Sequence, residues 1–417
     1  MVPNGWEQIR LNDVTEFITS GSRDWAQFYS DSGSKFVRMT NLSRDSIYLK
    51  LDDMKYVDVS SKSADGKRTS LSAGDVLMSI TAELGKIGWI PKNFGEAYIN
   101  QHTALIRLND KRANSQYIAY LLSSKAMNHR INKLNDSGAK AGLNLPTIRS
   151  IHINLPPLPE QRKIAQILST WDRGIATTEK LIDASKQQKK ALMQQLLTGK
   201  KRLVAPETGK VFDGKWERHS LSDLVYVDRK SLGKKTPDNF KFKYISLSNV
   251  DFGVISKELE VHEFSAAPSR ARRVLQDGDI LMSTVRPNLK GFAKVTSCYA
   301  DCIASTGFAV LTPKKKISGD YIYQYIFSAH VTGQIESLVV GSNYPAINSS
   351  DVSGLKVYCP AFEEQQKIAS VLTAADKEIE LLEAKLAHLK QEKKALMQQL
   401  LTGKRRVKVE HMEEATC

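Results

Sequence analysis

The chain has 417 residues, of which 41% are hydrophobic and 25% are charged, and this composition is typical of a folded protein and excludes an intrinsically disordered chain. Its 60 Lys and Arg residues against 45 Asp and Glu residues leave a formal net charge of +15, which favours a polyanionic partner such as nucleic acid. Single domains usually hold roughly 100–200 residues, so we expect two or more domains.

No stretch approaches the roughly 20 apolar residues of a membrane-spanning helix, and the N-terminal residues lack the apolar core of a signal peptide. We therefore expect a cytoplasmic protein. The four cysteines are too few for a disulfide framework, and no second Cys or His pair completes a zinc site with Cys298 and Cys302. We predict no bound metal.

The sequence KKALMQQLLTGK occurs twice, at residues 189–200 and 393–404, an offset of 204 residues. The same offset aligns EQ at 160–161 with EQ at 364–365, and GDVLMS from Gly74 with GDILMS from Gly278. Near the start, WEQIRLNDV from Trp6 aligns with WERHSLSDL from Trp216, at a slightly larger spacing. The chain is therefore a tandem duplication of a globular part followed by a helix.

In chain order, residues 1–155 form the first predicted globular domain. Its strand-like runs are KFVRMTNL, DVLMSI and TALIRL, and its helix-like run is SQYIAYLLSS. A first long helix is predicted within residues 156–200. Residues 201–359 repeat the order with FKYISLSNV, DILMSTV, GFAVLT and DYIYQYIFS, and a second long helix follows within 360–406. We expect residues 407–417 to be a disordered tail.

The two long helices carry heptad patterns. In the second helix the repeat runs through Ile368, Leu372, Ala375, Ile379, Leu382, Leu386, Leu389, Lys393, Leu396 and Leu400. The first has a weaker pattern in the same phase, through Ile164, Leu168, Trp171, Ile175, Thr178, Ile182, Ser185, Lys189, Leu192 and Leu196. Such heptads predict a coiled coil.

Each helix would be about 60 Å long at about 1.5 Å per residue, and the linker from Lys200 to Trp216 is too short to return along it unless nearly fully extended. We therefore predict an antiparallel helix pair with one domain at each end. Pseudo-twofold symmetry then places Ile182 opposite Leu382, Ile164 opposite Leu400, Leu196 opposite Ile368, and Lys189 beside Ala375. The predicted fold class is α+β, with two mixed α/β domains and a pseudo-twofold internal repeat.

Two similar domains held apart on a basic molecule are suited to reading two short DNA sequences with an unread gap between them. The residues LPPLPEQRKIAQIL with ALMQQLLTGK, and their second copy PAFEEQQKIASVL with the same ending, resemble the conserved regions of specificity (S) subunits of type I restriction-modification systems. The resemblance covers nearly the whole chain. The globular domains then correspond to target recognition domains.

This resemblance implies a non-catalytic, sequence-specific DNA-binding subunit that recognises a bipartite target in double-stranded DNA. It implies two methyltransferase (M) subunits docked on the helices, with restriction/translocase (R) subunits joining through the M2S1 complex. Those partners would use S-adenosylmethionine to methylate adenine N6, and ATP with Mg²⁺ for translocation and cleavage, so no cofactor is expected in this chain. It also implies a prokaryotic defence protein that lies at the nucleoid when bound to DNA.

Two other classes of protein remain open from the residues alone. A self-sufficient methyltransferase or nuclease is disfavoured because no phosphate-binding loop of the G-x-x-x-x-G-K-[ST] type is present. Leu155 interrupts the N-P-P-[FY] pattern of adenine methyltransferases at residues 154–157, and the pair Asp53 and Lys55 is too common in a charged chain to indicate a nuclease. The other alternative is a coiled-coil adaptor that binds only proteins.

Candidate DNA-binding residues are basic, amide or hydroxyl side chains in predicted loops, together with two aromatic residues of those loops, because Arg and Lys read guanine and phosphate whereas Asn and Gln read adenine. In the first domain they are Ser22, Arg23, Trp25, Asn41, Lys86 and Lys140. In the second they are Lys230, Lys234, Lys235, Asn249, Arg286, Asn288, Lys290, Asn343 and Tyr344.

Candidate docking residues for the M subunits lie on the apolar and Gln-rich faces near the helix ends: Leu192, Met193, Gln194, Gln195, Leu396, Met397, Gln398 and Gln399. Basic residues at the end of the first helix, such as Lys189 and Arg202, have a simpler explanation. Cations near a helix C-terminus stabilise the helix dipole and the free carbonyl groups there.

Overall fold

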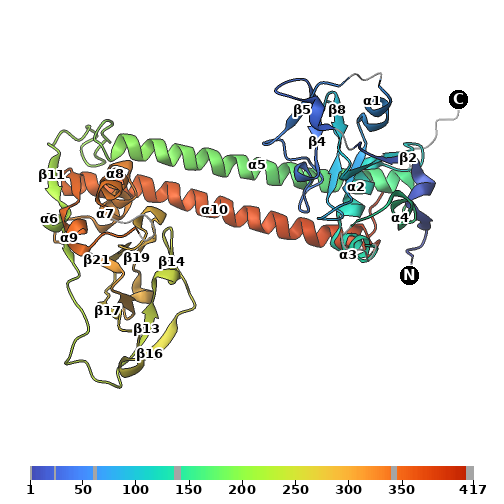
Figure 1. Ribbon diagram of the computed structural model, residues 1–417. Coiled ribbons are helices and arrows are strands. Elements are labelled where there is room, and N and C mark those ends of the chain that lie inside the picture. The colour runs from blue at the N-terminus through green and yellow to red at the C-terminus, as the bar shows by residue number, and fades with distance from the viewer. Residues whose placement is uncertain (1, 23–24, 60–62, 136–141, 340–344, 410–417) are drawn as a thin grey trace. The chain divides into compact units, whose positions relative to one another are not determined.

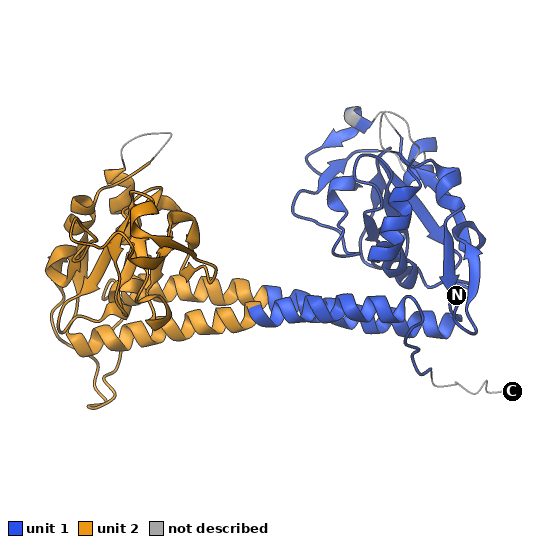
Figure 2. Cartoon of the chain, turned by 90° about the horizontal axis from the view of Figure 1, so that it is seen from below, with its two compact units in different colours: residues 1–179, 384–417 blue, residues 180–383 orange. Residues whose placement is uncertain are grey.

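The computed structural model describes residues 2–22, 25–59, 63–135, 142–339 and 345–409. The predicted tail falls mainly on residues 410–417, which lie outside the described residues. The chain forms two compact units, unit 1 with residues 1–179 and 384–417 and unit 2 with residues 180–383 (Figure 2). The boundary runs through both long helices, so each unit holds one globular part and one half of each helix.

The long helices are α5 (Leu158–Leu196) and α10 (Phe362–Leu400), with 39 residues each (Figure 1). Each helix is followed by a glycine with positive φ, 70° at Gly199 and 68° at Gly403, which is the left-handed residue that commonly ends a helix. Inside each unit the two helix halves run antiparallel, since Lys189 pairs with Asp376 and Lys186 with Glu383 in unit 2. The predicted antiparallel coiled coil is confirmed.

Within the residues that the structure describes, the globular part of unit 1 contains two four-stranded sheets and a two-stranded one. The first sheet is antiparallel, with the strand order β2 (Thr15–Ser20), β9 (Thr103–Leu108), β6 (Val76–Ser79) and β7 (Ile87–Trp89). The second has the order β3 (Tyr29–Ser30), β5 (Lys55–Val57), β4 (Ser34–Val37) and β8 (Ala97–Ile99). Strand β1 (Glu7–Arg10) pairs with β10 (His152–Leu155). The helices are α1 (Ala64–Thr69), α2 (Ser115–Ser123), α3 (Lys125–Lys133) and α4 (Leu145–Arg149).

Unit 2 repeats the antiparallel sheet and the parallel strand pair of the second sheet. The antiparallel sheet has the order β12 (Val225–Val227), β21 (Phe308–Pro313), β18 (Ile280–Ser283) and β19 (Phe292–Lys294). The second sheet has the order β16 (Glu260–Glu263), β13 (Lys241–Ile245), β20 (Ile303–Ser305) and β17 (Ala271–Val274). This second sheet has different edge strands in the two units, with β3 beyond β5 in unit 1 and β17 beyond β20 in unit 2. The smaller pairs are β11 (Glu217–Ser220) with β22 (Lys356–Cys359), and β14 (Val250–Asp251) with β15 (Val254–Ile255). The helices are α6 (Leu221–Leu224), α7 (Gly319–Ile326), α8 (Ala329–Leu338) and α9 (Ser349–Gly354).

The main core of each unit joins the antiparallel sheet to the long helices. In unit 1, Val76 and Ile106 of the sheet share a buried cluster with Tyr117 of α2, Ile164 of α5 and Leu400 of α10. The matching cluster of unit 2 contains both Leu196 and Ile368. Each globular part is therefore fixed on its stretch of the helix pair by apolar burial, at roughly 25 cal/mol per Å² of apolar surface.

The runs KFVRMTNL and FKYISLSNV were predicted as continuous strands, and this prediction is wrong in their second halves. Strand β4 ends at Val37, and residues Met39–Asn41 form a 3-10 turn. The reason is the side chain of Asn41, whose Oδ1 accepts the backbone N–H of Arg38 at 2.9 Å and whose Nδ2 donates to the Lys50 carbonyl at 2.9 Å. Such bonds from Asn to its own backbone favour turns over strands.

Candidate nucleic-acid interface

A buried carboxylate near the start of α5 ties both ends of the chain to unit 1. Arg406 binds Glu160 with two nitrogens, Nε to Oε1 at 2.7 Å and Nη2 to Oε2 at 2.8 Å, and Trp6 donates its indole N–H to Oε2 at 3.2 Å. The Glu160 side chain is only 4% exposed. Paired Arg–carboxylate bonds of this geometry are among the strong polar contacts of proteins.

Unit 2 contains the same contact between the residues that the repeat aligns with Glu160 and Arg406. Arg202 binds Glu364 through Nε at 2.6 Å and Nη2 at 2.6 Å, and its guanidinium lies 5.9 Å from the Trp216 ring centre. Arg202 was interpreted from the sequence as a cation serving the dipole of its own helix. That interpretation is wrong, because its partner is the start of the other helix.

A second repeated contact joins each globular part to its long helix through a glutamine. In unit 1, Gln161 accepts the backbone N–H of Asn114 at 2.8 Å and donates to the Pro156 carbonyl at 2.8 Å. In unit 2, Gln365 accepts from Ser318 at 3.0 Å and donates to the Pro360 carbonyl at 2.8 Å. The retained EQ pairs of the sequence therefore fix each domain on the helix that follows it.

A buried ion pair connects α5 and α10 inside unit 1. Lys393 Nζ lies 2.5 Å from Asp172 Oδ1, and Tyr120 of α2 donates its hydroxyl to Asp172 Oδ2 at 2.5 Å. The two charged side chains are 8% and 10% exposed. Burial, with the adjacent Asp172, raises the pKa of the Tyr120 hydroxyl, so Tyr120 remains a hydrogen-bond donor to the carboxylate.

The copy of this ion pair in unit 2 is more open. Lys189 Nζ lies 2.5 Å from Asp376 Oδ1, but the side chains are 16% and 42% exposed. Gln324 replaces the tyrosine and donates to Asp376 Oδ2 at 2.8 Å. Lys189 was predicted beside Ala375, and it reaches the next residue along α10.

The tight connection after β6 in unit 1 and after β18 in unit 2 carries different charged residues in the two units. Ala82 has a φ of 57° and its counterpart Arg286 a φ of 47°, so both loops hold a non-glycine residue in the left-handed region. Both loops also form a bridge to the segment that precedes a later short helix: Thr81 pairs with Gly142 before α4 in unit 1, and Val285 pairs with Ala346 before α9 in unit 2. Strained residues of this kind gather at functional sites.

In unit 2 this loop is cationic. Arg286 and Asn288 are exposed, and Lys290 is half-buried with Nζ donating to the Phe327 carbonyl at 3.3 Å. Burial lowers the pKa of the Lys290 amine. Arg286 and Asn288 are therefore displayed at the surface, whereas the position of Lys290 is determined by the fold.

In unit 1 the same loop carries an internal ion pair. Lys86 Nζ lies 2.5 Å from Glu83 Oε2, and the Lys86 side chain is 15% exposed. The paired Glu83 lowers the net charge that Lys86 can offer to DNA, and Ala82 carries no polar side chain where Arg286 stands in unit 2. The two domains thus present different chemistry on one shared backbone.

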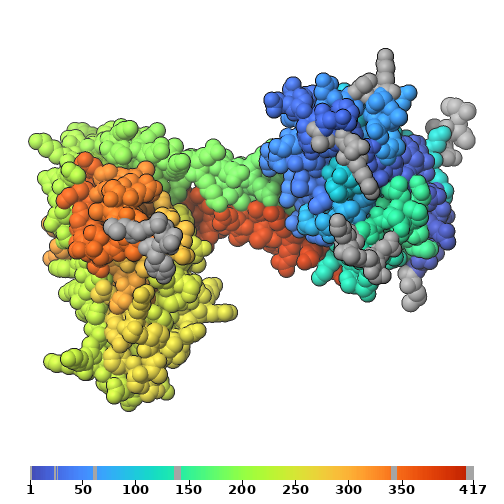
Figure 3. All heavy atoms as spheres, viewed as in Figure 1, coloured from blue at the N-terminus to red at the C-terminus, as the bar shows by residue number. Residues whose placement is uncertain are grey.

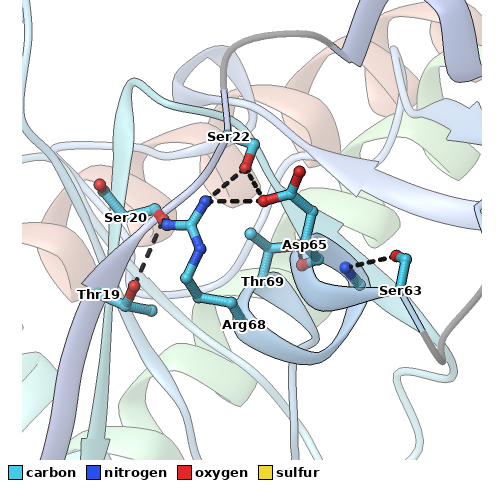
Figure 4. A network of polar contacts seen from close by, with 8 residues as sticks. Thr19, Ser20, Ser22, Ser63, Asp65, Arg68 and Thr69 are labelled. Carbon is cyan, nitrogen blue, oxygen red and sulfur yellow. Dashed lines mark hydrogen bonds and ion pairs between the residues drawn. The ribbon is translucent and has the colours of Figure 1, made fainter.

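The loop that follows β2 is held by an arginine of α1 (Figure 4). Arg68 donates Nη1 to the Ser20 carbonyl at 2.6 Å, and its Nη2 bonds Asp65 Oδ1 at 3.0 Å and the hydroxyl of Ser22. Ser22 also donates to Asp65, and this bond lowers the pKa of the Asp65 carboxyl. Ser22 is therefore part of a polar network that fixes the start of the loop, and Arg68, absent from our predicted set, is 43% exposed beside it.

Two candidates from the first domain have structural roles. Trp25 is 3% exposed and packs against Phe36 and Tyr98, with ring centres 4.9 Å and 5.7 Å away. Asn41 is 2% exposed and closes the 3-10 turn after β4. We withdraw both residues as DNA-contact candidates because their side chains are enclosed by the fold.

Three lysines of the second domain lie in the connection between β12 and β13. Lys230, Lys234 and Lys235 are exposed. Asn249 has the same role as Asn41, accepting the backbone N–H of Ser246 at 2.9 Å, and is half-buried. The candidates Arg23, Lys140, Asn343 and Tyr344 lie outside the described residues.

The predicted docking residues divide by side-chain type. Leu192 and Met193 pack partly buried against the core of unit 2, and Leu396 and Met397 against the core of unit 1. The glutamines that follow them are exposed: Gln194, Gln195, Gln398 and Gln399. Beside Leu192, a surface hollow of about 200 Å³ is lined by Ala374 and Ala375.

Within the described residues, no group of three or more His, Cys, Asp or Glu side chains is placed to hold a metal ion. Cys302 is buried, whereas Cys298 is exposed. No helix among the described residues is long and apolar enough to cross a membrane.

Comparison with known proteins gives consistent results. The model of the type I restriction modification DNA specificity domain matches residues 3–186 and 214–391. The type I restriction enzyme MjaVIII specificity subunit of Methanocaldococcus jannaschii is 26% identical over 437 residues, covering 98% of this chain and 94% of that protein. The HindI specificity subunit of Haemophilus influenzae is 27% identical over 40% of this chain and 36% of its own.

Among solved structures, the crystal structure of the type I restriction-modification system S subunit from M. genitalium superposes with a TM-score of 0.60, at 13% identity, over 96% of this chain and 97% of that one. A structure described as showing complex assembly and conformational transition of the type I R-M system gives a TM-score of 0.57, at 17% identity, over 97% and 100%. These likenesses support the fold. With two copies of the specificity domain covering most of its length, this chain belongs to the family of type I restriction-modification specificity subunits.

Proposed function

We propose that this specificity subunit binds a bipartite DNA target, with the globular part of each unit reading one half-site. The observation that carries the proposal is the contrast between retained and changed contacts. The contacts that hold each domain on the helix pair recur in both units, as in Glu160 with Arg406 and Glu364 with Arg202. The displayed loop differs, with Ala82 in one unit and Arg286 in the other.

The loop that differs between the units carries side chains that can read DNA bases in unit 2. Arg donates two hydrogen bonds to guanine in the major groove, and a well-placed pair of this kind discriminates against a wrong base by about 1–3 kcal/mol. Arg286 and Asn288 stand exposed on the unit 2 loop. The net charge of +15 supplies the general attraction to the phosphate backbone.

Catalysis is assigned to partner subunits. We propose that two methyltransferase subunits dock at the helix ends, where Gln194 and Gln195 of one copy and Gln398 and Gln399 of the other are exposed. Identical sequence at both ends suits two identical partners. Those subunits would methylate adenine N6 with S-adenosylmethionine, and the restriction subunits, joining through them, would use ATP and Mg²⁺ to cleave unmethylated DNA at the nucleoid.

The test is a map of N6-methyladenine in a strain that expresses this chain with its methyltransferase. We expect one split motif, with an adenine in each half and the two halves about one helical turn apart. A continuous motif would contradict the assignment of one half-site to each unit. Methylation by the purified chain alone is expected to be absent.

The contribution of Arg286 is tested by Arg286→Ala. The control is Lys316→Ala, which removes another cation of unit 2 whose backbone also lies in the left-handed region. We expect the Arg286 variant to lose about tenfold or more in affinity for the target, while binding to unrelated DNA changes little, because about 1–3 kcal/mol of base discrimination is lost. Unaltered discrimination in gel-shift titrations would remove Arg286 from the reading surface.

A further inference from the structure

Asp228, directly after β12, is held in a conformation that side chains rarely adopt. Its φ is 56°, in the left-handed region, and its side chain is only 11% exposed. A non-glycine residue in this region usually costs free energy and persists where surrounding contacts determine it. Asp228 therefore has a positional role that its sequence context does not reveal.

Four contacts hold Asp228 in this conformation. The backbone N–H of Asp228 donates to the Val310 carbonyl at 2.8 Å, and Val310 N–H donates back to Asp228 Oδ1 at 2.9 Å. Oδ2 accepts the Ser349 hydroxyl at 2.6 Å and pairs with Arg273 Nη2 at 2.6 Å. One carboxylate thus connects β21, α9 and β17 at the point where the chain leaves β12.

The segment that follows is fixed by the same arginine. Arg273 Nη1 lies 3.3 Å from the Ser231 hydroxyl, and Ser231 forms a bridge with Arg273 in the β17 strand. On either side, Leu232 N–H donates to the Arg272 carbonyl at 2.8 Å and Val274 N–H to the Lys230 carbonyl at 3.1 Å. Residues 230–232 therefore lie along β17 rather than forming a loose loop.

The fixed residues 230–232 lie within a stretch of concentrated positive charge. Arg229, Lys230, Lys234 and Lys235 are exposed, and Arg270, also exposed, lies just before β17. Asp238 is the single acidic residue between residues 229 and 240. The atoms of this part of the chain, coloured yellow-green to yellow, lie on the surface of unit 2 (Figure 3).

Unit 1 fastens the equivalent connection with the same three residue types. Arg68 bonds both Ser22 and Asp65 just after β2, the strand that corresponds to β12 at the edge of the antiparallel sheet. The carboxylate comes from α1 in unit 1 and from the end of β12 in unit 2. Both units therefore fix the connection that follows the edge strand of the antiparallel sheet, but they do so with residues at different positions of the repeat.

We propose that Asp228 is a positioning residue for DNA binding, which through Arg273 fixes residues 230–232 on β17 and thereby places the cations within and beside them, Arg229, Lys230, Lys234 and Lys235, against the phosphate backbone of the second half-site. The proposal rests on the proposed function of unit 2 as a DNA-recognition domain. It assigns a role in binding polyanionic DNA to an acidic residue that does not itself touch the DNA.

This role has an effect opposite in sign to that of simple electrostatics. Replacement of Asp228 by Asn removes one negative charge, which by charge alone would strengthen binding to DNA. Asn also tolerates the left-handed region better than most residues, so the backbone strain changes little. If the carboxylate holds Arg273 and the cations of residues 229–235 in place, Asp228→Asn weakens binding instead.

The experiment measures the salt dependence of binding by the assembled complex of this chain with its methyltransferase subunits. The probe is a duplex with the split motif found by methylation mapping, titrated at several KCl concentrations. Each phosphate contact contributes about 0.9 to the slope of log K against log salt concentration. We expect K234M/K235M to reduce this slope by roughly two, and D228N to reduce it by roughly one or more, with at least tenfold weaker binding.

The combination of D228N with K234M/K235M should reduce the slope little beyond the greater single effect, since both act on the same contacts. The matched control is D277N, which removes an exposed acid elsewhere in unit 2 and should leave binding unchanged or slightly stronger. A second variant, S231A, removes the tether between Arg273 and the segment without any change in charge. S231A should lower the slope by part of the D228N effect, and it therefore tests the positioning role if D228N does not fold.

An unchanged or steeper slope for folded D228N, or an unchanged slope for S231A where D228N does not fold, would overturn the positioning role. Loss of stability alone would lower the active fraction but leave the slope of the folded complex the same. If the wild-type complex shows no preference for the motif duplex over unrelated DNA, the proposed function fails and this inference fails with it.

Discussion

At the residue scale, the two lysines of the repeated KKALMQQLLTGK sequence occupy unequal surroundings. Lys393 pairs with Asp172 where both side chains are nearly buried, and Tyr120 completes the site. Lys189 pairs with Asp376, whose side chain is 42% exposed. A buried ion pair is costly to break because the remaining charge has no compensation, whereas an exposed one contributes little.

Replacement of Lys393 by Met is therefore expected to lower the free energy of unfolding by about 3 kcal/mol, because it leaves Asp172 buried without its cation. Lys189→Met should cost no more than about 1 kcal/mol, since water reaches Asp376. Urea unfolding followed by circular dichroism measures both, with Lys394→Met as an exposed neighbour. Equal losses from the two variants would contradict the difference in burial.

At the element scale, both long helices end in the same residues and yet meet different neighbours. Gly199 and Gly403 have φ values of 70° and 68°. A Cβ added at Gly199 would lie 3.3 Å from the Trp216 ring, whereas one added at Gly403 would lie 2.4 Å from Pro3 Cγ. The left-handed ending is common to both, but the space around it is not.

We expect Gly199→Ala to destabilise the protein by about 1 kcal/mol, the cost of placing alanine in the left-handed region. Gly403→Ala should cost about 3 kcal/mol, because the strain is joined by overlap with the rigid proline ring. Thermal unfolding of the two variants compares them directly. The reverse order, with Gly199→Ala the more harmful, would show that Pro3 moves away at little cost.

The elements also show why some predictions from sequence succeeded. The apolar runs TALIRL and SQYIAYLLSS lie in β9 and α2, and both are buried along most of their length, so a short run of apolar residues was enough to place them in the core. The strand predicted through Asn41 was wrong because one side chain bonds its own backbone, and Trp25 was misplaced because its burial depends on Phe36 and Tyr98, which are distant in sequence.

At the scale of the whole molecule, a duplicated architecture predicts that specificity changes in one half at a time. Arg286→Ala in unit 2 should relax recognition only in the half-site read by that unit, since the loop around Ala82 in unit 1 is unchanged. Methylation mapping of the variant strain would then show one degenerate half beside one intact half. Relaxation in both halves would contradict independent reading by the two units.

The sequence by itself determined the duplication, the two long helices with their heptads, the order of several strand-like runs along the chain and the family. These features are encoded locally or by exact repetition, so no three-dimensional information is needed. The tertiary structure decided which polar residues hold the domains and which face outward. Asp172 and Lys393 are 221 residues apart, and Asp228 meets Ser349 across 121, so only the folded chain brings these partners together. A charged residue has the same letter whether it is buried in an ion pair or offered to DNA, and solvent exposure in the fold distinguishes the two.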